Sequence, residues 1–211
     1  MIQEASCGTK DRDRLVFEAR TAGWTLMWGE YPGDLHVKKQ TKETNRANNV
    51  GNAMLVKTEL IAYQVIPGKE ETIYPLYHEG RWQHIVIALA GQGRNLHVIN
   101  FYGLSGARTD TTKAHFNDEH IGVVFDYIAT LGKAPVILGG DFNTNTQTSY
   151  KLAETVFTAN FTDLIDQGMR RKKPNRRTRL LVERKLEHLW GPGSFPLGFS
   201  FWERKLLNCM L

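Results

Sequence analysis

The strongest chemical signal lies at residues 136–144, which read Val-Ile-Leu-Gly-Gly-Asp-Phe-Asn-Thr. An apolar strand-like run there delivers Asp141 just after two glycines, which permit a tight turn and close backbone approach. If the chain stays extended, Asp141 and Asn143 point the same way, because side chains alternate along a strand. A carboxylate beside an amide suits holding a water and a phosphoryl oxygen. The same residues also fit a simple Asx turn after a strand.

Two weaker signals have the same character. The run at 96–102 places Asn100 and Tyr102 on one strand face and ends at Gly103. A tyrosine at a cleft mouth can hydrogen-bond a phosphate or orient a nucleophile, although alone it also fits a sheet-edge tyrosine. Glu4 follows a short apolar start, and Mg²⁺ is held by one or two carboxylates with water and substrate phosphates. By itself, Glu4 equally fits a surface residue.

The elements that position these residues are read from apolar spacing and from turn residues. Helices are predicted at 10–22, 112–131 and 152–157. Strands are predicted at 24–28, 53–56, 60–65, 83–90, 96–102 and 134–138. Gly23 is expected to end the first helix in a left-handed conformation, 31–48 is expected to be a surface loop, and 91–95 a hairpin turn. Together these elements favour an α/β or α+β body built on sheets.

Three motifs occur in a fixed order, namely Ile-Gln-Glu at 2–4, Asn-Phe-Tyr-Gly at 100–103 and Gly-Gly-Asp-Phe-Asn at 139–143. In this order they resemble the endonuclease/exonuclease/phosphatase superfamily, with its exonuclease III-like and DNase I-like members, over about residues 2–165. Two further runs, Gly-Arg-Trp-Gln at 80–83 and Tyr-Gly-Leu-Ser-Gly at 102–106, look most like endonuclease domains of non-LTR retrotransposons.

The resemblance implies a role for each matching residue. Glu4 matches the family's metal-binding glutamate, and Tyr102 matches the tyrosine that contacts the scissile phosphate. Asp141 matches the carboxylate that orients the water, and we also expect it to be a metal ligand. Asn143 matches the amide that binds the phosphate and steadies that carboxylate. The resemblance further implies Mg²⁺ or Mn²⁺ as cofactor and an α+β fold, a two-sheet sandwich flanked by helices with the site at one edge.

The sequence departs from the family pattern at both ends, so we expect an incomplete, truncated version of the fold. The family has a strand with an Asn before the Gln-Glu pair, and it ends on a Ser-Asp-His motif. No Asp-His pair occurs here, and no Asp follows Asp166. Leu104 and Ser105 stand where the family usually has Pro and Asn. We therefore expect a partial family domain at 1–167 and a divergent, basic, irregular tail at 168–211.

Positive charge is concentrated in that tail. Nine basic and two acidic residues lie between Arg170 and His188, whereas residues 1–169 carry a net charge of −3. Seven cations form the densest run: Arg170, Arg171, Lys172, Lys173, Arg176, Arg177 and Arg179. Such a run can neutralise phosphates, so we expect it to bind nucleic acid, DNA rather than RNA. The alternative is a solvated run without a partner.

Three functions remain open on the sequence. The first is a metal-dependent phosphodiesterase, a DNA endonuclease of retroelement type. The second is a degenerate, inactive member that at most binds nucleic acid, which the missing Asp-His pair favours. The third is a phosphoester phosphatase of the same superfamily. No apolar stretch is long enough to span a bilayer, and no signal peptide is recognisable. Two cysteines exclude a disulfide scaffold, so we expect an intracellular, nuclear or cytoplasmic protein.

Overall fold

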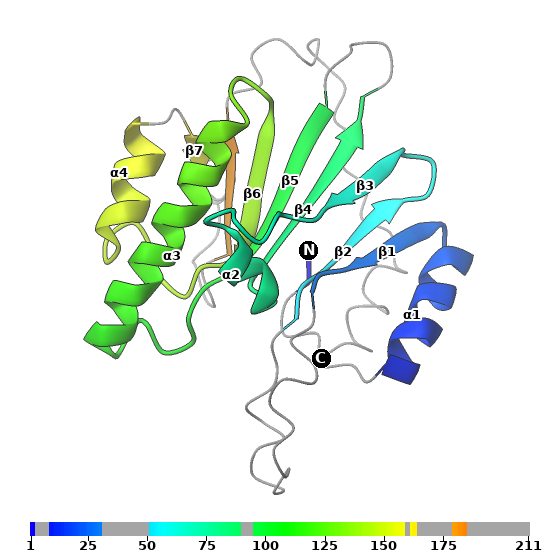
Figure 1. Ribbon diagram of the computed structural model, residues 1–211, viewed down its shortest axis with the longest axis horizontal. Coiled ribbons are helices and arrows are strands. Elements are labelled where there is room, and N and C mark those ends of the chain that lie inside the picture. Colours follow the sequence, from blue (N-terminus) through cyan, green and yellow to red (C-terminus); the bar gives the residue numbers. More distant parts are fainter. Residues whose placement is uncertain (3–8, 31–50, 90–94, 159–160, 164–178, 185–211) are drawn as a thin grey trace, which may run out of the picture.

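The structure is a computed structural model of the 211-residue chain. It describes residues 1–2, 9–30, 51–89, 95–158, 161–163 and 179–184, with the backbone alone at 9–10, 156–158, 162–163 and 179–184. Two β-sheets pack face to face, and helices cover their outer faces (Figure 1). The predicted two-sheet sandwich flanked by helices is therefore confirmed.

The larger sheet has six strands in the order β3-β4-β5-β6-β8-β7. These are β3 (Ala62–Val65), β4 (Trp82–Ala88), β5 (Asn95–Tyr102), β6 (Val136–Asp141), β7 (Phe161–Asp163) and β8 (Arg179–Arg184). Only β5 and β6 pair in parallel among these described strands. A parallel pair needs a long crossover, which the helix α3 (Thr111–Thr130) supplies. The smaller sheet pairs β1 (Trp24–Trp28) with β2 (Ala53–Lys57).

Capping residues mark the end of α1 and the start of α3. The first helix, α1 (Thr9–Thr21), is followed by Gly23 at φ +80°, so the predicted left-handed C-terminal glycine is confirmed. Asp110 caps α3, because its side chain accepts a hydrogen bond from the backbone N–H of Lys113 at 3.1 Å. The other two helices are α2 (Tyr74–His78) and α4 (Tyr150–Thr158). No helix in the described ranges is long and apolar enough to cross a membrane.

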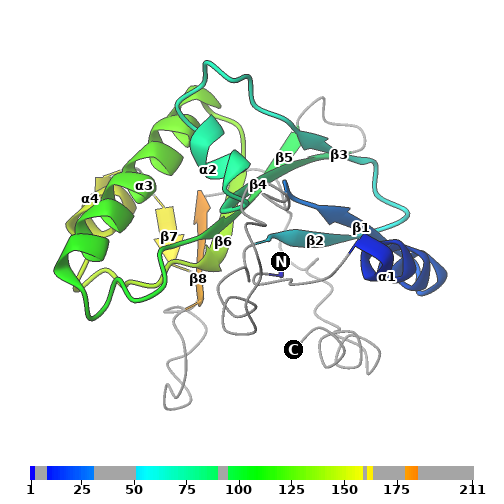
Figure 2. The same ribbon diagram turned by 60° about the horizontal axis from the view of Figure 1, so that its bottom comes forward.

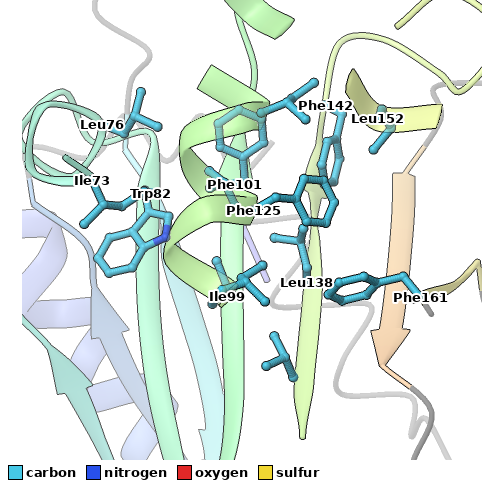
Figure 3. Packing of buried hydrophobic residues seen from close by; sticks show 14 of the residues in the cluster. Ile73, Leu76, Trp82, Ile99, Phe101, Phe125, Leu138, Phe142, Leu152 and Phe161 are labelled. Atoms are coloured by element: carbon cyan, nitrogen blue, oxygen red, sulfur yellow. The ribbon is translucent and has the colours of Figure 1, made fainter. Parts of the chain in front are cut away.

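The largest apolar core lies between the six-stranded sheet and helices α2, α3 and α4. Figure 3 shows Trp82, Ile99 and Phe101 from the sheet packed together with Phe125 of α3. The rings of Phe101 and Phe142 meet edge to face at 5.3 Å between centroids. Phe101 and Phe142 each adjoin a candidate site residue in sequence, so this core fixes the backbone that carries the site.

Two smaller cores hold the other layers together. Leu15 of α1 packs on Leu26 of the outer face of the smaller sheet. Met54 and Val56 from the other face pack against Ile85 of β4, which joins the two sheets. Figure 2 shows the resulting layers, with α1 beside the smaller sheet and α3 and α4 on the far side of the larger one.

The structure corrects several sequence-based boundaries. The strand expected at 134–138 runs instead from Val136 to Asp141, because pairing with β5 continues through both glycines. The strand expected at 60–65 begins at Ala62, since Leu60 lies in a turn and donates its N–H to the Lys57 carbonyl at 3.0 Å. The predicted loop at 31–48 lies outside the described residues, as does most of the hairpin turn at 91–95.

Three short elements, α2, β7 and β8, were not predicted from the sequence. Strand β8 differs most from expectation, because residues 179–184 lie within the tail that was predicted to be irregular. It pairs antiparallel with both β6 and β7, so it lies inside the larger sheet. Its short apolar run stands between charged residues and is too weak to predict a strand by itself. The strand forms through hydrogen bonds to β6 and β7. A domain boundary near residue 167 stays a prediction.

Buried His84 and half-buried His97 form a polar network under α3. The Nδ1 atom of His84 lies 2.9 Å from the Tyr127 hydroxyl, and its Nε2 atom lies 2.9 Å from Nδ1 of His97. Burial, and secondarily the facing His97, lowers the pKa of His84 to about 3. Burial also lowers the pKa of His97. The folded protein therefore keeps this pair neutral at pH values where an unfolded histidine is charged.

We expect the free energy of unfolding to fall by about 2 kcal/mol between about pH 7 and about pH 5 through His84 alone. The unfolded state takes up a proton below the usual histidine pKa, whereas folded His84 does not until about pH 3. Stability is therefore lost as the pH falls through that window. Urea unfolding at each pH measures the slope. His84→Phe should flatten it, and the exposed His115→Gln should not; equal slopes in all three proteins would refute the assignment.

Candidate active site

The carboxyl ends of β5 and β6 meet at one edge of the larger sheet. Because these strands run parallel, the register pairs Tyr102 directly with Asp141. The next N–H, that of Gly103, donates to the Asp141 carbonyl at 2.8 Å and extends this pairing by one residue.

The β4 strand begins at this edge. The end of β1 also reaches it, because Gln83 of β4 donates to the Met27 carbonyl. The start of β2 reaches it as well, because Asn52, just before β2, donates to the Asn100 carbonyl.

The turn after β6 differs from the extended geometry expected from the sequence. Asn143 adopts φ +50°, in the left-handed region that Asn tolerates better than most residues. Its backbone N–H donates to Oδ1 of Asp141 at 3.1 Å, which is the Asx turn considered as the alternative. Its side-chain amide donates to the Gly103 carbonyl at 3.0 Å. The expectation that both side chains point the same way along a strand is therefore wrong at Asn143.

This turn assigns the two groups different tasks. The Asp141 carboxylate is oriented by the backbone N–H of Asn143, not by its side-chain amide. The amide instead ties the turn after β6 to the loop after β5. Both residues are half-buried, so they border the surface without being fully exposed.

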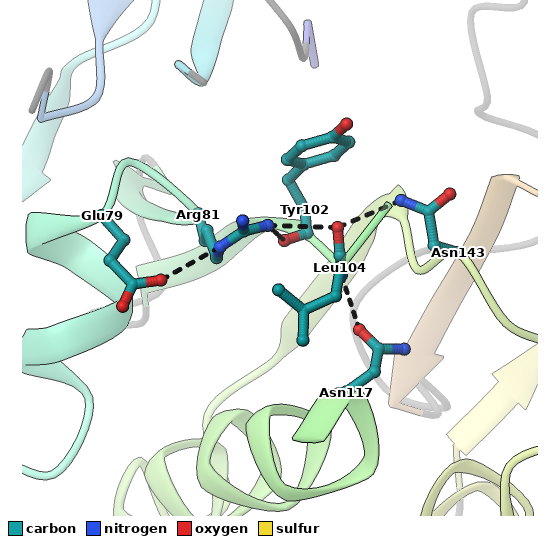
Figure 4. Close-up of polar contacts among 7 residues, drawn as sticks. Glu79, Arg81, Tyr102, Leu104, Asn117 and Asn143 are labelled. Atoms are coloured by element: carbon teal, nitrogen blue, oxygen red, sulfur yellow. Dashed lines mark hydrogen bonds and ion pairs between the residues drawn. The ribbon is translucent and has the colours of Figure 1, made fainter. Parts of the chain in front are cut away.

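The loop after β5 is held from three sides (Figure 4). Asn117 of α3, fully buried, accepts the Leu104 N–H at 2.7 Å and donates to the Phe142 carbonyl at 2.9 Å. Arg81, just before β4, donates through Nη1 to the carbonyls of Tyr102 and Gly103, at 3.4 and 3.2 Å. These contacts fix the backbone on both sides of Tyr102.

Tyr102 is only 4 % exposed, so its side chain does not stand free at a cleft mouth. Its hydroxyl lies 2.7 Å from the hydroxyl of Ser105, and either oxygen can be the donor. Ser105 is exposed and occupies the place where the family usually has Asn. The two hydroxyls together form a small polar pair at the end of β5, the strand whose last residue pairs with Asp141.

The amino end of the chain enters the same region. Ile2 and Ala53 exchange backbone hydrogen bonds of 2.7 and 2.9 Å, and Asn100 donates through its side-chain amide to the Ile2 carbonyl at 3.1 Å. Asn52, also buried, donates to the Asn100 carbonyl at 3.4 Å. Glu4 itself lies outside the described residues, so its part in the site stays a prediction.

Most of the basic run also lies outside the described residues, but its last member does not. Arg179 begins β8, and the antiparallel register pairs it with Asp141. The seven-cation run therefore ends in the backbone position opposite the candidate carboxylate. Its other six cations, from Arg170 to Arg177, have no described position, so their role stays a prediction.

The donor chemistry fits a hard divalent cation. Within the described ranges no three His, Cys, Asp or Glu side chains gather to form a metal cluster. The site contributes oxygen ligands through the Asp141 carboxylate, whose Oδ1 atom also accepts the Asn143 N–H. One carboxylate, with a second from elsewhere and water, is the arrangement in which proteins usually hold Mg²⁺.

Arg81 and Asn117 were not predicted from the sequence to lie at the candidate site. Arg81 belongs to the Gly-Arg-Trp-Gln run at 80–83, so the motif was seen but its contact with the Tyr102 loop was not. Asn117 lies on the inward face of α3 among apolar residues, and a polar residue at such a position is the signal that could have found it.

No protein-family model matches the chain, and no curated protein sequence is significantly similar to it. Solved structures, in contrast, are similar in fold. The human nocturnin catalytic domain, solved with a bound sulfate anion, aligns with a TM-score of 0.54 at 13 % identity. That alignment covers 82 % of this chain and 65 % of the nocturnin chain, so this chain spans just under two thirds of it.

Two further structures align less closely. The endonuclease domain of TRAS1, a telomere-specific non-LTR retrotransposon, aligns with a TM-score of 0.47 at 11 % identity, over 86 % of this chain and 82 % of that one. Humanized D. rerio TDP2 aligns with a TM-score of 0.45 at 12 % identity, over 85 % and 76 % of the two chains. The fold assignment rests on the nocturnin match, because the other two TM-scores lie below 0.5.

The sandwich, the parallel β5–β6 pair and the nocturnin match identify the fold. The chain has the α+β, DNase I-like fold of the endonuclease/exonuclease/phosphatase superfamily. The resemblance predicted from the three sequence motifs is therefore confirmed at the level of the fold.

Proposed function

We propose that the chain is a metal-dependent phosphodiesterase that cuts DNA, of the retrotransposon endonuclease type. The observation that carries the proposal is the pairing of Tyr102 with Asp141 at the ends of two parallel strands. The two residues that carry the carboxylate and the phenol hydroxyl therefore occupy neighbouring backbone positions at one edge of the larger sheet. The DNase I-like fold supports this assignment.

The residues divide the work of phosphodiester hydrolysis between them. The Asp141 carboxylate, fixed by the Asn143 N–H, orients a water and accepts its proton. The Tyr102 hydroxyl, paired with Ser105, donates to a phosphoryl oxygen as negative charge builds there. The Asn143 amide adds a second donor when a phosphate replaces its bond to the Gly103 carbonyl. Asp141 with Glu4 would hold Mg²⁺ or Mn²⁺, which polarises phosphoryl oxygen and stabilises the leaving oxygen.

Nucleic acid is the substrate that the charge distribution favours. The basic run ends at Arg179, whose backbone pairs with Asp141 in the register of the sheet. The backbone at the end of the run therefore adjoins the strand end that carries the candidate carboxylate. We favour DNA over RNA, in keeping with the resemblance to retrotransposon endonucleases.

One observation favours a second candidate, an inactive member that only binds nucleic acid. Two groups expected to bind the phosphate already have partners within the chain, since Tyr102 contacts Ser105 and the Asn143 amide contacts Gly103. An active protein must exchange these partners for substrate, whereas an inactive one keeps them. A phosphoester phosphatase, the third candidate, has no contact in the described residues that favours it over these two.

Incubation of the full chain with supercoiled plasmid separates the candidates. We expect nicking in Mg²⁺ or Mn²⁺ that excess EDTA abolishes, together with weaker cleavage of RNA of the same length. Plasmid retardation without nicking in either metal would support the inactive binder and overturn the proposal. Release of inorganic phosphate from a terminal monoester, with the plasmid intact, would support the phosphatase instead.

We expect the basic run to set the salt dependence of DNA binding. Each neutralised phosphate releases counterions, so affinity falls steeply as salt rises. Replacing all seven cations with Ala should flatten a plot of log affinity against log salt, with no change in preferred sequence. Fluorescence anisotropy with a labelled duplex measures the slope. Lys57→Ala and Lys133→Ala, outside the run, serve as controls; an unchanged slope in the seven-fold variant would show that the run is only a solvated segment.

A further inference from the structure

Arg81 stands at the junction of the two loops that form the candidate site. Its Nη1 donates to two consecutive carbonyls, those of Tyr102 and Gly103. Its guanidinium carbon also lies 5.7 Å from the centroid of the Tyr102 ring. One cation therefore contacts both the backbone and the ring side of the residue expected to meet the phosphate.

The Gly103 carbonyl links this arginine to the second loop. It accepts from Arg81 at 3.2 Å and from the Asn143 amide at 3.0 Å (Figure 4). A displacement of Arg81 therefore reaches Tyr102 directly and Asn143 through one shared oxygen.

The arginine is itself held in place by its backbone and by Glu79. The Arg81 carbonyl accepts the Tyr102 N–H, and the Arg81 N–H donates to the Leu76 carbonyl, both at 2.8 Å. Nε donates to Glu79 at 3.0 Å. The Arg81 side chain is 16 % exposed against 52 % for Glu79, so the guanidinium faces inward while its acidic partner faces solvent.

Stability alone explains this arrangement poorly. An ion pair with a half-exposed carboxylate contributes little to folding. A guanidinium, in contrast, has a planar fork that can engage a carboxylate and carbonyls at once, which a lysine ammonium on a flexible chain does not reproduce. The geometry thus requires arginine for orientation more than for charge.

We propose that Arg81 is a positioning residue, which sets the Tyr102 hydroxyl and the Asn143 amide for the phosphate without touching the substrate. This inference rests on the proposed phosphodiesterase function. Misplacing a reacting group by about 1 Å can cost on the order of 100-fold in rate. Arg81→Lys therefore lowers kcat by about 10- to 100-fold and leaves KM within about 2-fold.

A double-variant cycle tests the proposal. Plasmid nicking rates are measured for Arg81→Lys, Tyr102→Phe and the double variant. Because Arg81 acts in part through Tyr102, the loss in the double variant is expected to be smaller than the product of the two single losses. Multiplied losses in the double variant, or a wild-type rate in Arg81→Lys, would overturn the inference. Arg14→Lys is the matched control, because Arg14 also contacts carboxylates, those of Asp11 and Glu18 on the outer helix.

A second measurement separates failure of this inference from failure of the proposed function. Amide hydrogen exchange requires no activity, and the N–H groups of Gly103 and Leu104 donate to Asp141 and Asn117. We expect both amides to exchange faster in Arg81→Lys than in Arg14→Lys, with equal melting temperatures. Unchanged exchange would overturn the positioning role even in an inactive protein. Faster exchange in a protein without nuclease activity would reject the function and keep the role of Arg81 in ordering the loop.

Discussion

Asp141→Asn is expected to lower the rate of phosphodiester cleavage by about 10²- to 10⁴-fold, the range lost when a general base is removed. The substitution retains the shape of the side chain and an Oδ1 acceptor for the Asn143 N–H, which donates to Asp141 at 3.1 Å. The turn after β6 is therefore preserved, whereas the negative charge that accepts a proton or binds a cation is lost. Nicking of supercoiled plasmid under saturating Mg²⁺ measures the effect.

Asp126→Asn is the matched control, since Asp126 is exposed on α3, away from the sheet edge. It makes the same loss of charge without touching the site. We expect the control to cleave at the wild-type rate and both variants to melt at the same temperature. An Asp141→Asn protein that cleaves at the rate of the Asp126→Asn control would exclude Asp141 from catalysis.

The strands and helices that the sequence revealed most accurately are those in which pattern and packing agree. Strand β1 was predicted at its observed bounds, because bulky residues fill it and Gly23 ends the helix before it. The α3 helix was predicted at 112–131, one residue away from its observed bounds. The prediction was close because the inward apolar positions of this helix recur at helical spacing. In both elements, the local sequence pattern and the packing into the core favour the same secondary structure.

The elements that were missed depend on partners distant in sequence. Strand β8 follows a dense run of cations and contains only a few apolar residues, so its own pattern is weak. Its strand conformation comes from hydrogen bonds to β6 and β7 on either side. Helix α2 is too short to show a period, and it is defined by packing of Leu76 and Tyr77 into the main core.

The candidate site shows the same division. Tyr102 and Asp141 were proposed from the sequence because each lies at the end of a predicted strand, and the parallel register places their backbone positions side by side. The left-handed turn at Asn143 and the contacts of Arg81 and Asn117 were not found. Those contacts end on backbone carbonyls and amides, which every residue carries, so no side-chain pattern in the sequence can encode them.

Gly103→Ala is expected to cost about 1–3 kcal/mol of stability, as overpacking of a close-packed site does, and to lower the cleavage rate by about 100-fold or more. A Cβ at Gly103 would overlap the Phe142 carbonyl oxygen and lie 2.7 Å from Oδ1 of Asn117. Neither neighbour is the free end of a flexible chain, because one is backbone and the other is a buried amide with two hydrogen bonds. The loop after β5 must therefore move away from the turn after β6.

That movement would separate the two halves of the site, because the Gly103 carbonyl is the acceptor shared by Arg81 and Asn143. Gly122→Ala in α3 is the control, since a Cβ there meets nothing within 4 Å and alanine favours a helix. Urea unfolding and plasmid nicking are measured on both. We expect the control to be as stable as the wild type or more so, and fully active. A Gly103→Ala protein with wild-type nicking would show that catalysis does not depend on the close contact between these two loops.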